Sequence, residues 1–393
     1  MKKPLLPYML IAFIWGLGFW GMPMHDPDLS WHLLAGKWIL ANNSVPSTDF
    51  INAFAKTWID YHWLSQILFY LCYKIGGFFG LRVLLGILMG ILSSLVMATV
   101  AVQWRGKEAL NVAVLISFFA AMYPIGALTS IRPHVIALIT IAISQIVVLS
   151  KTSRTKQLLA LFFLTALTAN IHVYWIFIPF IWVSYRIFPR CLDREELAPL
   201  YVWGGFFLLA LSGTLSPYGF FGKEGIFSNY YPLYEYFTMS SELKKRILEL
   251  KPLFAAGGSM PSVIFFCALA IASKYSIKRA CAQYKIIFPA LILLFLTLGS
   301  LKFASLLSLF SIYPLTKALL MLRRTAKKTI PLPVRFFERS FFLWLVLLVV
   351  SLRAYFNSPW VYENSFFFDE ELPIKECSKI PSLADGRSSI LIL

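Results

Sequence analysis

Long apolar runs separated by short polar segments make up most of this chain. A helix that crosses a bilayer core of about 30 Å needs roughly 20 apolar residues, and runs of about that length recur from the N-terminus to about residue 355. The pattern predicts an all-α fold, a polytopic transmembrane bundle of about eleven spans. The predicted spans are residues 5–22, 80–103, 109–124, 133–150, 157–170, 172–188, 198–215, 258–273, 286–301, 303–321 and 339–355.

Composition and charge agree with a membrane protein. The chain is 59% hydrophobic and only 14% charged, which excludes a single soluble globule with a polar surface. Its net charge of +17 comes from basic clusters that fall on alternate sides of the predicted spans, so we interpret it as orientation in the membrane and expect no nucleic acid partner. The pattern places the chain in the plasma (inner) membrane, with a cytoplasmic N-terminus and an extracytoplasmic C-terminus.

Two predicted outer loops, residues 23–79 and 216–257, are too long to be simple connectors. Loops of that length in a compact bundle are usually functional. We therefore expect residues 1–355 to form one transmembrane domain that carries both loops. We expect residues 356–393 to form an extracytoplasmic tail, whose apolar ending "SSILIL" resembles a sequence that has been cut short.

The first outer loop opens with "HDPDLSWHLLAGKWILAN", which predicts a short interfacial helix. Asp26 is placed as its N-cap, Pro27 at its first position and Asp28 in its first turn, where the helix dipole favours an anion. Asp28 and His32 are four residues apart and share a face. Asp26 is therefore either a helix cap only or, with Asp28, part of an acidic site.

A second interfacial helix is predicted from about Trp58, in "TWIDYHWLSQILFYLCYKIGG". It places Asp60 and His62 at the membrane surface among aromatic residues, either as solvated residues at the level of the lipid headgroups or as members of the acidic site. The tryptophans of this loop are interpreted as interface anchors rather than as a platform on which a sugar stacks.

Three further polar motifs stand at the outer ends of predicted spans. "SIRPHVIA" contains Arg132 and His134, "TANIHVYW" contains Asn170 and His172, and "LSPYGFFGKEG" contains Tyr218. Each residue alone could be a snorkelling side chain or a helix-end hydrogen bond. Because they share one membrane face, where ionisable residues are expensive, we treat them together as candidates for a functional site.

The second outer loop contains "MSSELKKRILELKPLF", which predicts an amphipathic helix with three adjacent cations, Lys244, Lys245 and Arg246. These cations either rest on anionic headgroups or clamp a lipid-linked phosphate. Lys302 is expected on the same side and either joins the clamp or snorkels.

The first motifs carry a resemblance. "HDPDLSWHLLAGKWILANNSVPSTDF" followed by "WIDYHWLSQILFYLCYKIGG" is similar to a group of bacterial proteins that resemble the GT-C superfamily of integral membrane glycosyltransferases. "IRPH", "ANIH" and "SPYG" resemble later motifs of that group, so the likeness extends over most of residues 5–320.

The resemblance implies transfer of a sugar from a polyprenyl-phosphate or polyprenyl-diphosphate donor to an acceptor on the outer face. In that superfamily an acid of the first outer loop serves as base or orienter, and Asp26 occupies that place, with Asp28 as its partner and His32 alongside. From the residues themselves we expect a second set to bind substrate or phosphate: Asp60, His62, Arg132, His134, Asn170, His172, Tyr218, Lys245, Arg246 and Lys302. Some GT-C enzymes use a divalent cation, which Asp26, Asp28 and a histidine would bind here.

Two other classes of protein remain open. In a lipid or solute transporter, the same polar residues would line a translocation path, and in a non-catalytic envelope assembly protein the acids would be dispensable. Transporters usually carry internal repeats and polar interruptions at mid-span, whereas the charge here concentrates at one face. The sequence therefore favours an enzyme.

Overall fold

The computed structural model contains helices joined by turns and loops. It describes residues 6–21, 26, 28–50, 58–103, 118–119, 121–122, 125, 130–186, 199–218, 227–239, 292–293, 295–297, 300 and 303–312. No strand occurs among these residues, so the prediction of an all-α fold is confirmed for them.

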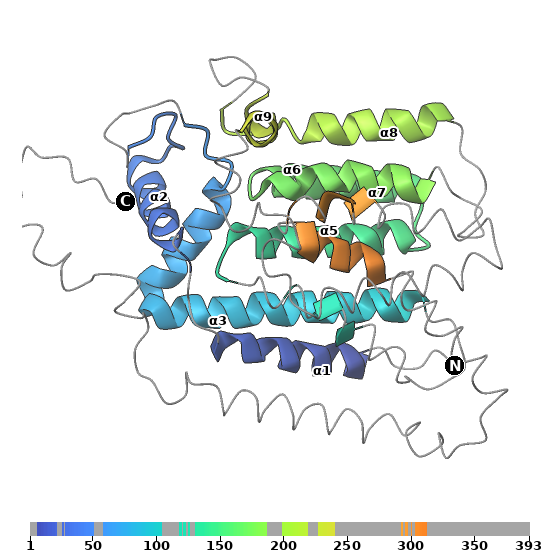
Figure 1. The fold of residues 1–393 in the computed structure, drawn as a ribbon, viewed down its shortest axis with the longest axis horizontal. Helices are drawn as coiled ribbons and strands as arrows, with labels where there is room; N and C mark the ends of the chain where they lie inside the picture. Colours follow the sequence, from blue (N-terminus) through green and yellow to red (C-terminus); the bar gives the residue numbers. More distant parts are fainter. Residues whose placement is uncertain are drawn as a thin grey trace, which may run out of the picture.

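Several helices lie side by side, and others are gathered at one end of the bundle. Figure 1 shows α1, the longer arm of α3, α5, α6 and α8 running alongside one another, with α2 and the first arm of α3 gathered at one end. The elements are α1 (Leu6–Leu17), η1 (Gly18–Gly21), α2 (Leu29–Asn42), α3 (Trp63–Gln103), α5 (Pro133–Leu149), α6 (Arg154–Ala169), η2 (Val173–Ile176), α7 (Phe177–Arg186), α8 (Pro199–Ser212), η4 (Ser228–Tyr230) and α9 (Tyr231–Thr238), where η marks a 3₁₀ helix.

A sharp kink divides α3 into two arms. Gly77 has φ 57° and ψ −146°, a conformation that only glycine adopts readily. Just beyond the kink the chain passes close to itself, because a Cβ on Gly80 would lie 2.4 Å from the carbonyl oxygen of Cys72. The first arm covers the residues of the helix predicted for this loop, and the second begins close to the predicted span 80–103.

The first arm begins at Trp63, later than the predicted start near Trp58. The residues between Trp58 and Trp63 are not helical, because they form hydrogen bonds with other segments of the chain. The backbone N–H of Trp58 donates to the carbonyl of Ser47, and the backbone N–H of Asp60 donates to the hydroxyl of Tyr218. These tertiary contacts outweigh the local tendency to extend the helix.

By length and composition, one described helix could cross a membrane, over Trp63–Thr99. Helices over Tyr8–Gly21, Pro133–Leu149, Val173–Tyr185 and Pro199–Ser212 are apolar but shorter. They coincide with predicted spans, yet the number of crossings stays a prediction. The predicted spans 258–273 and 339–355 lie outside the described residues, as do most of 109–124 and the predicted amphipathic helix of the second outer loop.

Glycines allow α1 and α3 to approach closely. A Cβ on Gly16 would lie 2.4 Å from the carbonyl oxygen of Met89, and a Cβ on Gly90 would lie 2.9 Å from the ring of Phe13. Gly86 and Gly90 are four residues apart on α3, and this spacing of small residues is typical of helix pairs in membranes.

Gly16→Ala is expected to destabilise the protein, because the new methyl group meets backbone atoms of α3 that cannot move aside. Overpacking of this kind costs about 1–3 kcal/mol. The measurement is the thermal unfolding midpoint in detergent, with Gly18→Ala as the matched control because nothing lies within 4 Å of a Cβ there. Equal midpoints for the two variants would contradict the close α1–α3 contact.

Candidate functional site

Five segments that are far apart in sequence meet at one end of the bundle. They are the residues before α2, α3 and α5 and the residues that follow α6 and α8. Polar contacts join them in pairs: Arg132 to Asp26, Asp60 to Tyr218, and Trp63 to Asn170. The polar motifs predicted to share a face therefore converge in the described structure.

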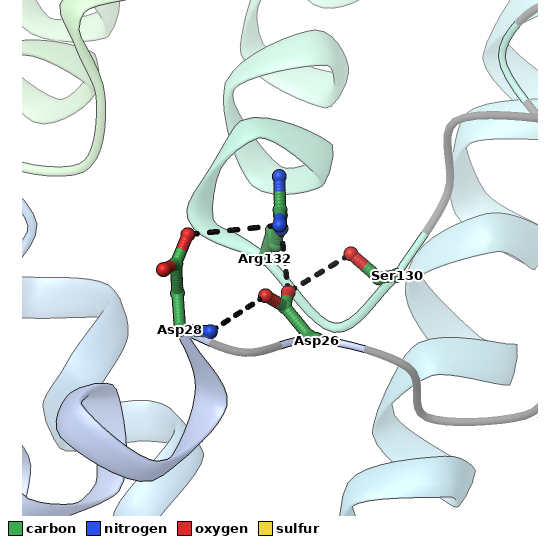
Figure 2. A network of polar contacts seen from close by, with 4 residues as sticks. All are labelled: Asp26, Asp28, Ser130 and Arg132. Atoms are coloured by element: carbon green, nitrogen blue, oxygen red, sulfur yellow. Dashed lines mark hydrogen bonds and ion pairs between the residues drawn. The ribbon is translucent and has the colours of Figure 1, made fainter. Parts of the chain in front are cut away.

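Asp26, Asp28 and Arg132 form a compact ionic network (Figure 2). The Nε of Arg132 donates to Oδ2 of Asp26 at 2.6 Å, and Nη2 lies 3.6 Å from Oδ2 of Asp28. The hydroxyl of Ser130 also donates to Oδ2 of Asp26, at 2.9 Å. The Asp26 side chain is fully buried, whereas 50% of the Asp28 side chain is exposed. Of the two acids, Asp28 is the one that solvent reaches.

The start of α5 explains how Arg132 reaches this network. Pro133 stands in the first turn of α5, where a missing N–H is tolerated, and it forces the preceding residue out of helical geometry. Arg132 is accordingly extended, with φ −125° and ψ 154°. The guanidinium is 20% exposed, and burial alone would lower the pKa of Arg132, but the hydrogen bond and charge of Asp26 and the charge of Asp28 raise it overall.

Asp26 also shapes the turn that leads into α2. Its Oδ1 accepts the backbone N–H of Asp28 at 3.0 Å, and its carbonyl accepts the N–H of Leu29 at 3.1 Å. The N-cap is Asp28 and α2 begins at Leu29, two residues later than predicted. The prediction that Asp26 is the N-cap is therefore wrong, because Asp26 turns away to meet Ser130 and Arg132. Pro27 lies outside the described residues.

Asp60 is the centre of a second polar cluster, which is almost completely buried. Its Oδ1 accepts the backbone N–H of His62 at 3.1 Å and Nε2 of Gln66 at 3.0 Å. Its backbone N–H donates at 2.6 Å to the hydroxyl of Tyr218, which in turn donates to the carbonyl of Pro46. Burial raises the pKa of Asp60 to about 7, although the bonds from His62 and Gln66 act in the opposite direction. The predicted role of Asp60 as a solvated headgroup-level residue does not fit a residue that is 1% exposed.

Four of the five histidines lie in a row through this cluster. Ring centroids are 5.5 Å apart between His32 and His62, 5.3 Å between His62 and His172, and 6.5 Å between His172 and His134. Burial, followed by the charges of His62 and Arg132, holds the pKa of His32 well below its ordinary value. His32 is therefore a neutral imidazole at physiological pH.

Backbone contacts fix different tautomers on two of these rings. Nδ1 of His62 lies 2.8 Å from the carbonyl oxygen of Ile171, which can only accept, so this nitrogen carries a proton. Nδ1 of His172 accepts the backbone N–H of Tyr174 at 3.2 Å, so it carries none. The neutral rings therefore present an Nε2 acceptor on His62 and an Nε2–H donor on His172.

Asn170 and Tyr218 connect the elements around the cluster. Oδ1 of Asn170 accepts the indole N–H of Trp63 at 2.8 Å, and its Nδ2 donates to the carbonyls of Ala166 and Leu215. The side chains of Asn170 and Tyr218 thus form hydrogen bonds within the protein. Their contacts with a substrate stay a prediction.

The two clusters act on one another. The charge of Arg132 contributes to the lowered pKa of His32. Nδ1 of His32 lies 3.4 Å from Nε2 of Gln66, which donates a hydrogen bond to Asp60. The backbone N–H of His32 also donates to the carbonyl of Asp28 at 3.1 Å. Ion pairs connect Asp26, Asp28 and Arg132, and hydrogen bonds and ring contacts connect the other residues of the site: His32, Asp60, His62, His134, Asn170, His172 and Tyr218. Lys245, Arg246 and Lys302 lie outside the described residues.

Three residues of the site had no predicted role: Gln66, Ser130 and Tyr174. All three stand in motifs that were identified, in "WLSQ", "SIRPH" and "IHVYW". The motifs marked the right segments, but only the tertiary contacts reveal what these side chains do.

The divalent cation implied by the resemblance does not suit Asp26 and Asp28 as they are arranged. Both oxygens of Asp26 accept protein donors, and a guanidinium already lies against both acids. Within the described part of the chain, no group of three or more His, Cys, Asp or Glu could hold a metal ion. The described network places a guanidinium where a cation would bind.

Asp60→Asn is expected to stabilise the protein in alkaline solution. The unfolded chain ionises Asp60 near its ordinary pKa of 3.8, whereas the folded protein does so near 7, so stability is lost as the pH rises through that interval and stays low above it. The loss amounts to about 4 kcal/mol at most. Asn keeps the acceptor oxygen and removes the buried charge.

Unfolding midpoints of the wild type and Asp60→Asn should therefore differ clearly at about pH 8 and little at about pH 4. Asp49→Asn is the matched control, because it makes the same substitution in the same loop at an acid that is only partly buried. If the midpoints of the wild type and Asp60→Asn differed by the same amount at both pH values, the raised pKa of Asp60 would be refuted.

Comparisons with known proteins assign no family to this arrangement. No family model matches the chain, no curated protein matches it, and no solved structure matches its fold. Function is therefore inferred from the residues and contacts of the chain itself.

Proposed function

We propose that the chain is a membrane glycosyltransferase of the GT-C type. It transfers a sugar from a polyprenyl-phosphate or polyprenyl-diphosphate donor to an acceptor on the outer face of the plasma membrane. The observation that carries this proposal is the network of Asp26, Asp28 and Arg132 at the end of an apolar helix bundle.

The chemistry of sugar transfer needs a cation, which this network supplies, and a proton acceptor near it. The acceptor hydroxyl loses a proton as it attacks the anomeric carbon, and the departing phosphate gains charge that a cation stabilises. Arg132 is suited to the phosphate, because a guanidinium forms forked hydrogen bonds with phosphate oxygens. Its partial exposure, and the half-exposed side chain of Asp28, give a substrate access to both.

Within this proposal the two acids have different roles. Asp26 orients Arg132, because it is buried and binds the guanidinium through Nε. Asp28 contacts the substrate. His32 is a neutral ring one helical turn after Asp28, and Lys245, Arg246 and Lys302 are proposed to supply further charge to the donor phosphate.

The setting of the site also supports an enzyme at a membrane surface. The ionic network adjoins the ends of helices rather than their middles, whereas a transporter would need polar groups along a path through the bilayer. The proposed topology has eleven spans, a cytoplasmic N-terminus and the site on the outer face.

Arg132→Gln and Asp28→Asn are each expected to reduce sugar transfer roughly 100-fold or more while the protein is still expressed and inserted. Asp26→Asn is expected to do the same, although Asn can still accept the N–H of Asp28, because the ion pair that positions Arg132 is lost. The measurement is consumption of polyprenyl-phosphate mannose and polyprenyl-phosphate glucose by purified protein, with native membranes as the source of acceptor.

Asp49→Asn again serves as the control and should transfer sugar like the wild type. Full activity in Arg132→Gln would exclude the proposed phosphate contact. Absence of transfer by the wild type with both donors would count against the glycosyltransferase itself.

The proposed topology predicts that a reporter active only in the cytoplasm gives a signal when fused after Arg190 and none when fused after Asn357. The two positions fall on opposite sides of the membrane because an odd number of predicted spans separates them. Signal at both positions would require a different number of spans.

A further inference from the structure

Two acceptor atoms in the Asp60 cluster have no donor among the residues that the structure describes. Among the described residues, neither Oδ2 of Asp60 nor Oε1 of Gln66 accepts a hydrogen bond, and both atoms are buried. The two residues are 1% and 0% exposed, and their other polar atoms bond each other at 3.0 Å. A buried acceptor without a donor costs about 1–3 kcal/mol, so a native protein that keeps two of them side by side needs a reason.

The other two acids of the site are held differently. Asp26 and Asp28 both face the guanidinium of Arg132. In the described part of the chain, no Lys or Arg forms an ion pair with Asp60. Asp60 is thus the acid of this site that has a lone pair to receive a proton and no fixed cation to oppose its protonation.

We infer that Asp60 is the proton acceptor of the transfer reaction and that Gln66 positions its carboxyl group. The inference rests on the proposed function. As the acceptor hydroxyl oxygen bonds to the anomeric carbon, the bond from that carbon to the phosphate oxygen breaks and its electron pair leaves with the phosphate. The hydroxyl proton passes to Oδ2 of Asp60, directly or through one water molecule.

The buried environment suits this role. A general base works best when its pKa is near the pH at which the enzyme operates, and burial brings the pKa of Asp60 to about 7. Among the described residues, Tyr61, His62 and Tyr218 lie next to Asp60, while His32 contacts Gln66 and His172 contacts His62. The charges of Asp28 and Glu235 act on the neighbouring Tyr61, and the charge of Arg132 acts on His32.

Infrared difference spectroscopy tests the protonation of Asp60 without any substrate. Spectra of the wild type minus Asp60→Asn should contain a protonated carboxyl band that disappears as the pH rises, with a midpoint near 7. Absence of that band at about pH 5 would mean that Asp60 is already ionised there, which would overturn the inference whether or not the protein transfers sugar.

Transfer assays with the polyprenyl-phosphate mannose and glucose probes test the role itself. Asp60→Asn imitates the protonated carboxyl, so transfer should fall roughly 100-fold or more at every pH while the folded protein persists. Gln66→Met removes a hydrogen bond that lowers the pKa of Asp60, so the acidic limb of the pH profile should move to higher pH.

Ser65→Ala is the matched control for Gln66→Met, because Ser65 is buried one residue away and bonds the carbonyl of His62 instead. Its pH profile should stay where it is in the wild type. Normal transfer by Asp60→Asn, or an unshifted profile in Gln66→Met, would overturn the inference while leaving a working glycosyltransferase. Absence of transfer by the wild type would instead refute the proposed function, and with it the role of Asp60.

Discussion

The ion pair between Asp26 and Arg132 holds the candidate site together. It joins residues 106 positions apart in sequence, and it buries the carboxylate completely. A buried charge is tolerated only when it is paired and hydrogen-bonded, and Asp26 meets both conditions through Arg132, Ser130 and the N–H of Asp28. Removing one partner would leave the other charge uncompensated. The pair therefore sets where α2 begins and where Arg132 points.

A second group of contacts fixes the segment before α3. Asp60, Trp63 and His62 contact Tyr218, Asn170 and the carbonyl of Ile171, which come from the ends of α6 and α8. These bonds hold Asp60 in a place where ionisation is costly. Such tension between stability and chemistry is common where a protein needs a proton acceptor near neutral pH.

Local sequence signals predicted several elements well. Pro133 marks the start of α5 and the apolar run ends near Ser150, so the predicted 133–150 agrees with Pro133–Leu149. The glycine pair in "KIGGFFG" separates an interfacial segment from an apolar run, and the kink lies at Gly77. The predicted start of α2 is two residues too early, because the helix boundary there depends on the contact between Asp26 and Arg132, the residue before α5.

The chemistry of the site was less predictable than its location. The motifs indicated one membrane face, but the sequence does not show that Asp26 is saturated with donors or that Asp60 is buried. Tyr218 lies 158 residues from Asp60, and nothing local links them. Gln66 likewise contacts His32, which lies on another helix, and nothing in the local sequence indicates this contact.

The most direct test of a sugar-transfer site here is a cryo-electron microscopy structure of the protein with a bound polyprenyl-phosphate sugar. The account predicts that the phosphate contacts the guanidinium of Arg132 and that the sugar lies between Asp28 and the Asp60 cluster. A donor phosphate bound elsewhere, with Arg132 still engaged only by Asp26 and Asp28, would contradict it.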